Sequence, residues 1–197
     1  MTTVLITAFE PYDRWEQNSS WLALLELTKA LPTGLKVVTR LYPVDFEKAR
    51  GRLREDLAAN YDYALLVGQA PGSSRIHLEQ IGVNVGGNSK QLPDQFCPIV
   101  DDGPVAYRSA LPLGDWAGKV RELGIPCQVS YNAGTYLCNA VLYLAHYFAE
   151  REQLHTRAAF IHLPLAPVQI LGERQDLPTL PSETCAAGIQ AILRELE

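Results

Sequence analysis

Apolar runs and amphipathic segments alternate along the chain. Short apolar runs rich in β-branched residues predict strands over residues 3–8, 35–42, 63–67, 127–131 and 158–163. Segments with apolar residues at helical spacing predict helices over residues 20–30, 45–60, 113–123, 135–150 and 182–196. Uninterrupted apolar strands are typical of a parallel sheet covered on both faces. The pattern therefore predicts one α/β domain over residues 1–197, an α/β/α sandwich around a mostly parallel twisted sheet.

Three further segments qualify this picture. Residues 75–85 look extended, whereas residues 86–106 are polar, contain several Gly and Pro, and lack periodicity. A loop of that length in a compact domain usually serves a site or is mobile. Residues 172–181 form a Pro-containing connection. Asn18 with Ser19, and Ser182 with the two residues after it, are the side chains expected to cap the helices that follow them.

The predicted topology indicates where a ligand would bind. Open α/β sheets bind ligands outside the carboxyl ends of their strands. The segments expected there are residues 9–15, 68–72, 134–139 and 162–167. Glu79 can reach the same end only if its strand is suitably placed.

Cys138 is the best nucleophile candidate. It follows a glycine turn at residues 133–134 and lies near the start of an apolar helix, where unpaired N–H groups favour a thiolate. His162 ends an apolar strand and could accept and return the proton, and Glu79, alone among apolar neighbours, could orient the imidazole. On its own stretch alone, Cys138 is better interpreted as a buried apolar filler, because free cysteines commonly are, and the segments of His162 and Glu79 shift the balance toward a nucleophile.

The other candidates also have ordinary structural interpretations. His146 lies within an apolar helix and is expected to be a core histidine, and His77 and His155 are expected at the surface. His162 could bond backbone carbonyls, and Glu79 could be a solvated strand residue. Spacing alone does not decide between these readings, since cysteine-peptidase signatures do not transfer between families.

Four segments resemble one known family. They are residues 7–12, 67–72, 132–139 and 160–164, with weaker matches at 41–44 and 92–94. Together they occur in the family's order and span nearly the whole chain, and the Ala-Gly-x-Tyr-x-Cys-Asn segment ending at Asn139 is the specific one. On these residues the sequence resembles pyroglutamyl peptidase I, also called pyrrolidone-carboxylate peptidase, a family of cysteine exopeptidases.

The resemblance implies a catalytic triad of Glu79, Cys138 and His162. Cys138 would attack the amide after an N-terminal pyroglutamyl residue of a peptide and form a thioester acyl-enzyme. His162 would act as base and then acid, with Glu79 orienting it. Hydrolysis of the thioester would release 5-oxoproline.

The resemblance also implies a substrate-binding set of Phe9, Tyr12, Asn18 and Gln69. The two aromatic side chains would sandwich the flat, uncharged ring, and Asn18 and Gln69 would bond its lactam from side chain or backbone. A pocket for such a ring needs apolar faces and a few polar partners rather than a charged clamp. The Cys138 backbone N–H is a natural donor to the oxyanion.

Two departures from the family pattern stand out. Tyr12, Asp13 and Arg14 replace the usual Phe-Gly-Gly, and Gln91 stands where the family commonly has an arginine. These changes leave the rate and substrate preference open. Alternatives are therefore a same-mechanism amidase acting on another cyclic or blocked amide, and a catalytically weak homologue that binds lactams or peptides. Nucleotide binding is not favoured, because no Gly-rich phosphate motif follows the first strand.

Composition and charge limit the classes of partner and the cellular compartment that we expect for this protein. A net charge of −5, a pI near 5.4 and the lack of a basic stripe argue against nucleic acid or an anionic membrane as partner. The start of the chain lacks a secretory pattern, and residues 137–149 are too short to span a bilayer, so we expect a cytoplasmic protein. The four scattered cysteines are expected to be free, with no metal site and no cofactor. A homo-oligomer and the identity of the natural peptides remain open.

Overall fold

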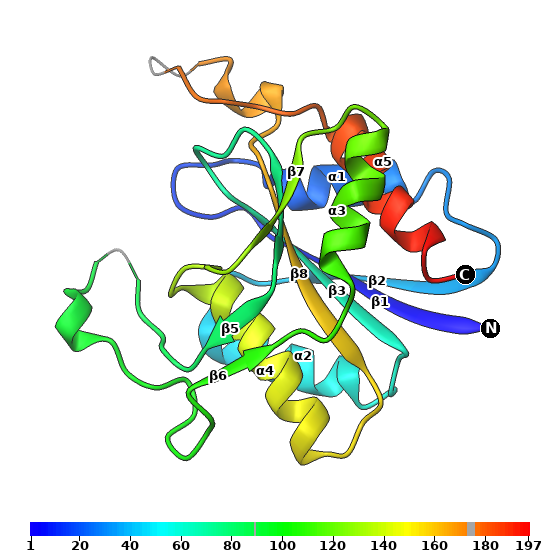
Figure 1. The fold of residues 1–197 in the computed structure, drawn as a ribbon. Helices are drawn as coiled ribbons and strands as arrows, with labels where there is room; N and C mark the ends of the chain where they lie inside the picture. Colours follow the sequence, from blue (N-terminus) through cyan, green and yellow to red (C-terminus); the bar gives the residue numbers. More distant parts are fainter. Residues whose placement is uncertain (89, 173–175) are drawn as a thin grey trace.

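A six-stranded sheet forms the centre of the computed structural model, which describes residues 1–88, 90–172 and 176–197 (Figure 1). The strands are β1 (Thr2–Phe9), β2 (Leu35–Tyr42), β3 (Tyr63–Gln69), β4 (Ile76–Glu79), β7 (Cys127–Ser130) and β8 (Arg157–Leu163). Their order across the sheet is β2-β1-β3-β8-β4-β7. Only the β4–β8 pair of these neighbours is antiparallel, so the predicted mostly parallel sheet is confirmed.

Helices cover both faces of the sheet, as Figure 1 shows. One face carries α1 (Ser19–Leu27), α3 (Leu113–Glu122) and α5 (Ser182–Arg194), and the other carries α2 (Phe46–Leu57) and α4 (Leu137–Arg151). Strand β1 shows why: Val4 and Ile6 belong to the first hydrophobic cluster and Leu5 to the second. Successive side chains of a strand point to opposite faces, so an unbroken apolar run supplies two cores at once.

Of the two helix caps predicted from the sequence, one is present in the structure. Asn18 is the N-cap of α1 and accepts a hydrogen bond from the Ser20 backbone N–H at 3.0 Å, as predicted. The predicted cap of α5 at Ser182 is wrong. Pro181, extended at φ −54° and ψ 142°, is the N-cap, and Ser182 is already the first helical residue.

The extended segment at residues 75–85 consists of two strands rather than one. After β4, the short strand β5 (Ile81–Val83) leaves the main sheet and pairs antiparallel with β6 (Ala106–Arg108), which the sequence did not predict. Between β5 and β6 the chain forms an arm, residues 84–88 and 90–105, that includes the short 3-10 helix η1 (Pro93–Gln95) and extends away from the sheet (Figure 1). The predicted loop therefore projects from the body.

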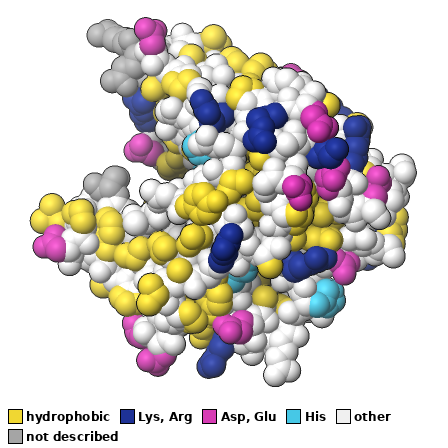
Figure 2. Space-filling model, in the orientation of Figure 1, with side chains coloured by type: hydrophobic (Ala, Val, Ile, Leu, Met, Phe, Trp, Pro, Cys, Tyr) yellow, Lys and Arg dark blue, Asp and Glu magenta, His cyan; other side chains and the backbone are white. Residues whose placement is uncertain are grey.

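The surface and the connections that follow β8 complete the description of the fold. Figure 2 shows apolar side chains over the arm and charges of both signs interspersed elsewhere on the same face. None of the helices in the described ranges is long and apolar enough to cross a membrane. Part of the connection predicted over residues 172–181 lies outside the described residues; in the rest, the Leu180 N–H donates to the Leu165 carbonyl at 2.9 Å. A second 3-10 helix, η2 (Pro167–Ile170), follows β8.

The direction of β4 decides how its side chains reach the centre of the sheet. Because β4 runs against β8, His77 lies opposite His162 and Glu79 opposite Phe160. Glu79 is the last residue of β4, but the carboxyl end of β4 points the opposite way from that of β8. Glu79 therefore lies beside the middle of β8 and not at the edge where β1, β3 and β8 end. The rule for parallel sheets holds here for β1, β3 and β8 but does not apply to β4.

Candidate active site

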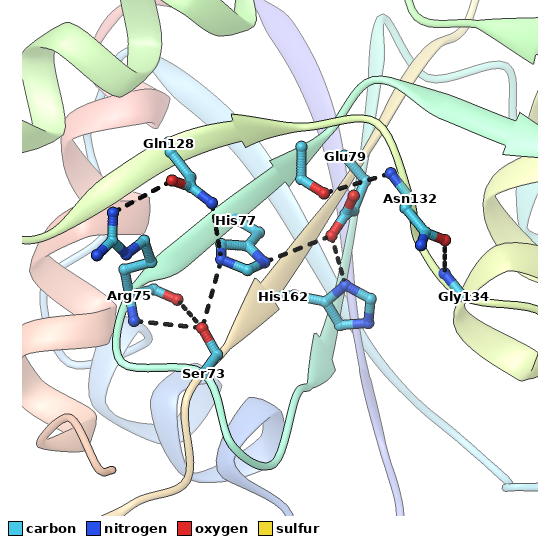
Figure 3. A network of polar contacts seen from close by, with 9 residues as sticks. Ser73, Arg75, His77, Glu79, Gln128, Asn132, Gly134 and His162 are labelled. Carbon is cyan, nitrogen blue, oxygen red and sulfur yellow. Dashed lines mark hydrogen bonds and ion pairs between the residues drawn. The ribbon is translucent and has the colours of Figure 1, made fainter.

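The His162 imidazole and the Glu79 carboxylate form a buried pair across β8 and β4. His162 Nδ1 lies 2.8 Å from Glu79 Oε1, and the Glu79 carboxylate can only accept, so Nδ1 donates. Glu79 has no exposed surface and His162 is 8% exposed. The bond fixes the tautomer of the neutral ring and turns Nε2 away from Glu79, as Figure 3 shows.

The Cys138 sulfur lies close enough to His162 to raise the pKa of its imidazole. Cys138 is the second residue of α4, half-buried, and it follows a turn in which Gly134 has φ +79°. A Cβ atom on Gly68 would lie 3.1 Å from Cys138 Sγ and 2.5 Å from the Phe160 ring. The sulfur therefore occupies space that only a glycine at this strand position leaves open.

The surroundings of His162 favour its charged form. Burial alone would lower the pKa of His162, but the Cys138 sulfur and the Glu79 carboxylate outweigh burial and raise the pKa to about 9. An opposite charge or an acceptor near an imidazolium stabilises it. The arrangement can therefore hold a proton between the sulfur and the carboxylate at neutral pH.

His77 belongs to the same network, so its predicted surface position is wrong. It is half-buried because β4 lies between β8 and β7, and Figure 3 shows its ring between Gln128 and Glu79. His77 Nε2 lies 3.2 Å from Gln128 Nε2, which can only donate, so the proton of the neutral ring is on Nδ1, 3.9 Å from Glu79 Oε1. Burial lowers the pKa of His77, and 3.9 Å is too long for a hydrogen bond, so His162 is the better-placed base.

The predicted surface position of His155 is confirmed, and the predicted core position of His146 is confirmed only in part. Burial lowers the pKa of His146 to about 4, and its partly buried ring stacks on Tyr107. Its Nε2 finds no hydrogen-bond partner among the described residues. The His155 side chain is 57% exposed, beside Asp62.

A narrow cavity of about 40 Å³ lies beside the Cys138 sulfur, and we call it the slot. It is lined by Phe9, Tyr12, Asn18, Val44, Gln69, Tyr136, Leu137 and Cys138. The four residues that the resemblance assigns to substrate binding are thus all in this lining, together with the candidate nucleophile. Phe9 also packs in the core against Phe160, so it holds one wall of the slot in place.

Gln69 and Asn18 contribute differently to the slot. Gln69 is 4% exposed; its Oε1 accepts from the Ser19 backbone N–H at 2.9 Å, while its Nε2 has no hydrogen-bond acceptor among the described residues. Asn18 Oδ1 accepts from Ser20, and its Nδ2 donates to the Glu10 carbonyl at 3.0 Å. The Asn18 side chain therefore shapes the turn, and Gln69 supplies the buried free donor.

In the altered loop, Asp13 stands at a position where the resemblance implies a glycine. Asp13 has φ +54°, a left-handed conformation that Asp tolerates better than most residues. Burial and the nearby Cys138 sulfur raise the pKa of Tyr12 to about 12, so its hydroxyl stays protonated beside Gln69. Arg14 lies over the Trp15 ring. Gln91 lies on the arm, lining a different cavity, where its Oε1 accepts from the Asn88 N–H at 3.1 Å.

Sequence reasoning missed two residues that support the site. Asn139, next to Cys138, is fully buried and bonds backbone groups of Val83 in β5 and of Val85. Gln169, in η2, donates to Gln69 Oε1 at 2.7 Å. A polar residue on the inner side of an apolar helix was the signal available for Asn139. For Gln169, the signal was a glutamine two residues after a proline that starts a short helix.

Metal chemistry has no candidate site in the part of the chain that the structure describes. No group of three or more His, Cys, Asp or Glu side chains there is placed to hold a metal ion.

The fold and this geometry define the class: an α/β protein whose cysteine, histidine and glutamate meet beside a narrow apolar slot, the arrangement of a cysteine hydrolase. The family follows from comparison with known proteins. The family model for pyroglutamyl peptidase matches residues 2–196, and the chain belongs to that family. The resemblance seen in the sequence is thereby confirmed.

Relatives match over nearly their whole length. The pyrrolidone-carboxylate peptidase of Streptomyces coelicolor is 37% identical, with 98% of this chain and 91% of the relative covered. The crystal structure of pyrrolidone carboxyl peptidase from Fervidobacterium islandicum AW-1 superposes with a TM-score of 0.93 at 31% identity, covering 100% and 98% of the two chains. The enzyme from Thermococcus litoralis gives 0.89 at 30% identity, covering 98% and 92%. These matches also confirm the predicted fold class.

Proposed function

We propose that this chain is a cysteine exopeptidase that removes an N-terminal pyroglutamyl residue from peptides. In this proposal Cys138 is the nucleophile, His162 the base and acid, Glu79 the orienting carboxylate, and residues 1–197 act as one catalytic domain. The observation that carries it is the Cys138 sulfur beside His162 at the edge of the slot, with Glu79 Oε1 2.8 Å from His162 Nδ1.

The chemistry of the slot supports a pyroglutamyl ring as the occupant. The ring is small, flat and uncharged, and the described lining contains aromatic, aliphatic and amide side chains but no carboxylate and no Lys or Arg. The Gln69 Nε2 donor is buried without an acceptor, which is costly unless a ligand supplies one. The lactam carbonyl of the substrate would accept that hydrogen bond, and Phe9 and Tyr12 would contact the faces of the ring.

In the first half-reaction the thiolate of Cys138 attacks the carbonyl carbon that joins the pyroglutamyl residue to the peptide. The C–S bond forms as the carbonyl oxygen becomes an oxyanion. The N–H of Cys138 is a suitable donor to it, because the first N–H groups of a helix lack intrahelical acceptors. As the C–N bond breaks, the His162 imidazolium gives its Nε2 proton to the leaving amine, so the shortened peptide departs with a neutral amino group and a thioester remains.

In the second half-reaction water cleaves the thioester. His162, now neutral, takes one proton from water while the hydroxyl oxygen bonds to the acyl carbon. The C–S bond then breaks, which restores the Cys138 thiolate and releases 5-oxoproline. Glu79 stabilises the imidazolium in both halves and does not itself need to take up a proton.

Fluorogenic pyroglutamyl, prolyl and glutamyl amides test this proposal. We expect kcat/KM for the pyroglutamyl amide to exceed the other two by at least about 100-fold, because the slot would leave a charged amine or carboxylate unpaired. Cys138→Ser should lower kcat by about 1000-fold or more without changing the unfolding free energy much. Cys97→Ser is the matched control, since Cys97 is an exposed thiol on the arm. Full activity of Cys138→Ser would refute the assignment.

The Tyr12 hydroxyl beside Gln69 favours one alternative function, in which the same chemistry acts on another cyclic or blocked amide. This hydroxyl adds a polar group to the slot. Preference for an N-acyl or larger lactam amide over the pyroglutamyl amide would select that candidate. Lactam binding without turnover of any amide would instead indicate a binding homologue.

We further propose that the protein works in the cytoplasm. All four cysteines are free, and free thiols stay reduced in a reducing compartment such as the cytoplasm. Fractionation of cells that produce the protein, with the activity assayed in each fraction, tests this point.

A further inference from the structure

The Gln169 side chain, half-buried in η2, is held at both ends by backbone groups. Its Oε1 accepts from the Ala166 N–H at 2.8 Å, and its Nε2 donates to the Gln17 carbonyl at 2.9 Å. An N–H can only donate and a carbonyl can only accept, so the amide of Gln169 has one orientation. The second N–H of Nε2 is then available, and it donates to Gln69 Oε1 at 2.7 Å.

Gln69 is consequently clamped between two donors. Its Oε1 receives hydrogen bonds from the Ser19 N–H and from Gln169 Nε2. Rotating the Gln69 amide by half a turn would set its own N–H groups against both donors in a site that is 4% exposed. The clamp therefore keeps Nε2, which has no acceptor among the described residues, on the side of the slot.

We propose that Gln169 is a specificity-determining positioning residue: it orients Gln69 so that the slot presents a donor to a ring carbonyl. Gln169 is not part of the slot lining and acts through Gln69. It follows His162 by seven residues, so the segment that leaves the base also fixes the recognition group. The inference rests on the proposed function in that the ring carbonyl belongs to a pyroglutamyl substrate.

Gln169→Glu tests the clamp with almost no change in size. A carboxylate can still accept from the Ala166 N–H, but it cannot donate, and its second oxygen would face Gln69 Oε1 at about the present 2.7 Å. Gln69 is then expected to turn its Nε2 toward the carboxylate and its carbonyl toward the slot. The donor for the ring carbonyl is lost, while Cys138 and His162 stay in place.

The first measurement uses 2-pyrrolidone, the bare lactam ring, to protect Cys138 from iodoacetamide. In Gln169→Glu the concentration that halves the alkylation rate should rise about 30-fold, with the unprotected rate within about twofold of the unaltered protein. Gln169→Ala, which removes one of the two donors, should show a smaller rise. Gln190→Glu is the matched control, because Gln190 Nε2 also donates to a backbone carbonyl, that of Ala30, away from the slot.

The second measurement separates recognition from general damage. In Gln169→Glu, kcat/KM should fall about 30-fold for a pyroglutamyl amide and by less than about threefold for the cyclopentanecarbonyl amide, which lacks the lactam. When Gln69→Ala is already present, Gln169→Glu should lower kcat/KM for the pyroglutamyl amide by little more. Unchanged protection by 2-pyrrolidone, equal losses on both amides, or full additivity with Gln69→Ala would overturn the clamp.

Failure of the clamp and failure of the proposed function give different results. If the unaltered protein is protected by 2-pyrrolidone and Gln169→Glu is not, but no pyroglutamyl amide is hydrolysed, the clamp stands and the peptidase proposal fails. If pyroglutamyl amides are hydrolysed and Gln169→Glu is indistinguishable from the control, the peptidase proposal stands and the clamp fails.

Discussion

The His162 ring experiences opposing influences that the surrounding residues resolve in favour of its charged form. Burial favours the neutral ring, and the Cys138 sulfur and the Glu79 carboxylate favour the imidazolium strongly enough to bring the pKa to about 9. Since His162 must donate a proton to the leaving amine, its charged form is the one needed at the start of the proposed reaction.

The raised pKa of His162 predicts where activity falls at alkaline pH, the alkaline limb of the pH profile. A raised pKa means that the imidazolium persists from neutral pH up to about pH 9, so kcat/KM should fall above that value. Glu79→Gln removes a group that raises the pKa, so the limb should move to lower pH by about one unit or more. A profile of kcat/KM between pH 5 and 10.5 is the measurement.

His77 provides the control for that profile. His77→Asn should leave the limb within about 0.3 units, because His77 Nδ1 is 3.9 Å from the Glu79 carboxylate and does not bond it. A limb that stays fixed in Glu79→Gln, or that moves upward, would contradict the role given to the carboxylate.

The sequence identified single residues whose residue type has distinctive chemistry. It did not identify positions or orientations that depend on contacts with residues far away in the chain. Cys138, His162 and Glu79 were identified from residue type, local pattern and family resemblance, and the structure brings them together. The half-buried position of His77 follows from strand pairing with β7 and β8, which no local pattern encodes. The orientation of Gln69 depends on Ser19 and Gln169, which are 50 and 100 residues away.

At the scale of elements, Asn139 connects α4, the helix of Cys138, to the strand after Glu79. Its Oδ1 accepts from the Val83 N–H at 2.8 Å, and its Nδ2 donates to the carbonyls of Val83 and Val85 at 2.9 Å each. In the same contact, a Cβ on Gly82 would lie 2.8 Å from the Tyr143 backbone nitrogen, so β5 packs directly on the α4 backbone. Helix α4 and the β4–β5 segment are thereby held in one relative position.

Asn139→Ala should weaken both the fold and the reaction. Two hydrogen bonds to Val83 in β5 and one to Val85 are lost, so we expect the unfolding free energy to fall by about 3 kcal/mol. We also expect kcat to fall by at least about 10-fold, because the first turn of α4 that carries the sulfur loses its attachment. Urea unfolding and steady-state kinetics measure the two effects.

Asn84→Ala is the matched comparison. Asn84 also bonds backbone groups on both sides of its amide, but these belong to Ile99, Val100 and Gly103 on the arm. Asn84→Ala should lower the unfolding free energy, but its loss of kcat should be much smaller than that of Asn139→Ala. Equal losses of kcat in the two variants would show that the attachment of α4 to β5 has no special role in placing the sulfur.

Most elements could be predicted from periodicity, because their apolar residues repeat over eight or more positions or form unbroken runs. Strand β2 has the predicted bounds, Leu35–Tyr42. Strands β5 and β6 are three residues each, too short to show an alternation, so one was merged with β4 and the other was missed. The reversed direction of β4 is a property of the sheet, and local patterns carry no information about it.

At the scale of the whole molecule, the four thiols lie in contrasting environments. Burial raises the pKa of Cys127 to about 11 and that of Cys185 to about 12, and both belong to the hydrophobic cluster opposite α4. Cys97 is exposed on the arm, and Cys138 is half-buried beside the slot. Because the thiolate is the reactive form, the fold itself should select which cysteines react.

Iodoacetamide at neutral pH should therefore alkylate Cys138 and Cys97 and leave Cys127 and Cys185 unmodified in the folded protein. Peptide mass spectrometry at successive times, with activity followed in parallel, is the measurement. Inactivation should track Cys138 and be unchanged in Cys97→Ser. EDTA should not alter activity; a loss with EDTA that zinc restores would contradict the proposed metal-free mechanism.

Strand β8, which carries His162, has a hydrogen-bonded neighbour along each side, β3 and β4. Local opening of a sheet begins at its margins, here β2 and β7, where one side of the strand is unpaired. In hydrogen–deuterium exchange the amides of β8 should be among the slowest in the protein. His162 thus lies on backbone that should stay in place when the outer strands open, so the proposed turnover should persist during partial fraying that would inactivate a site on an outer strand.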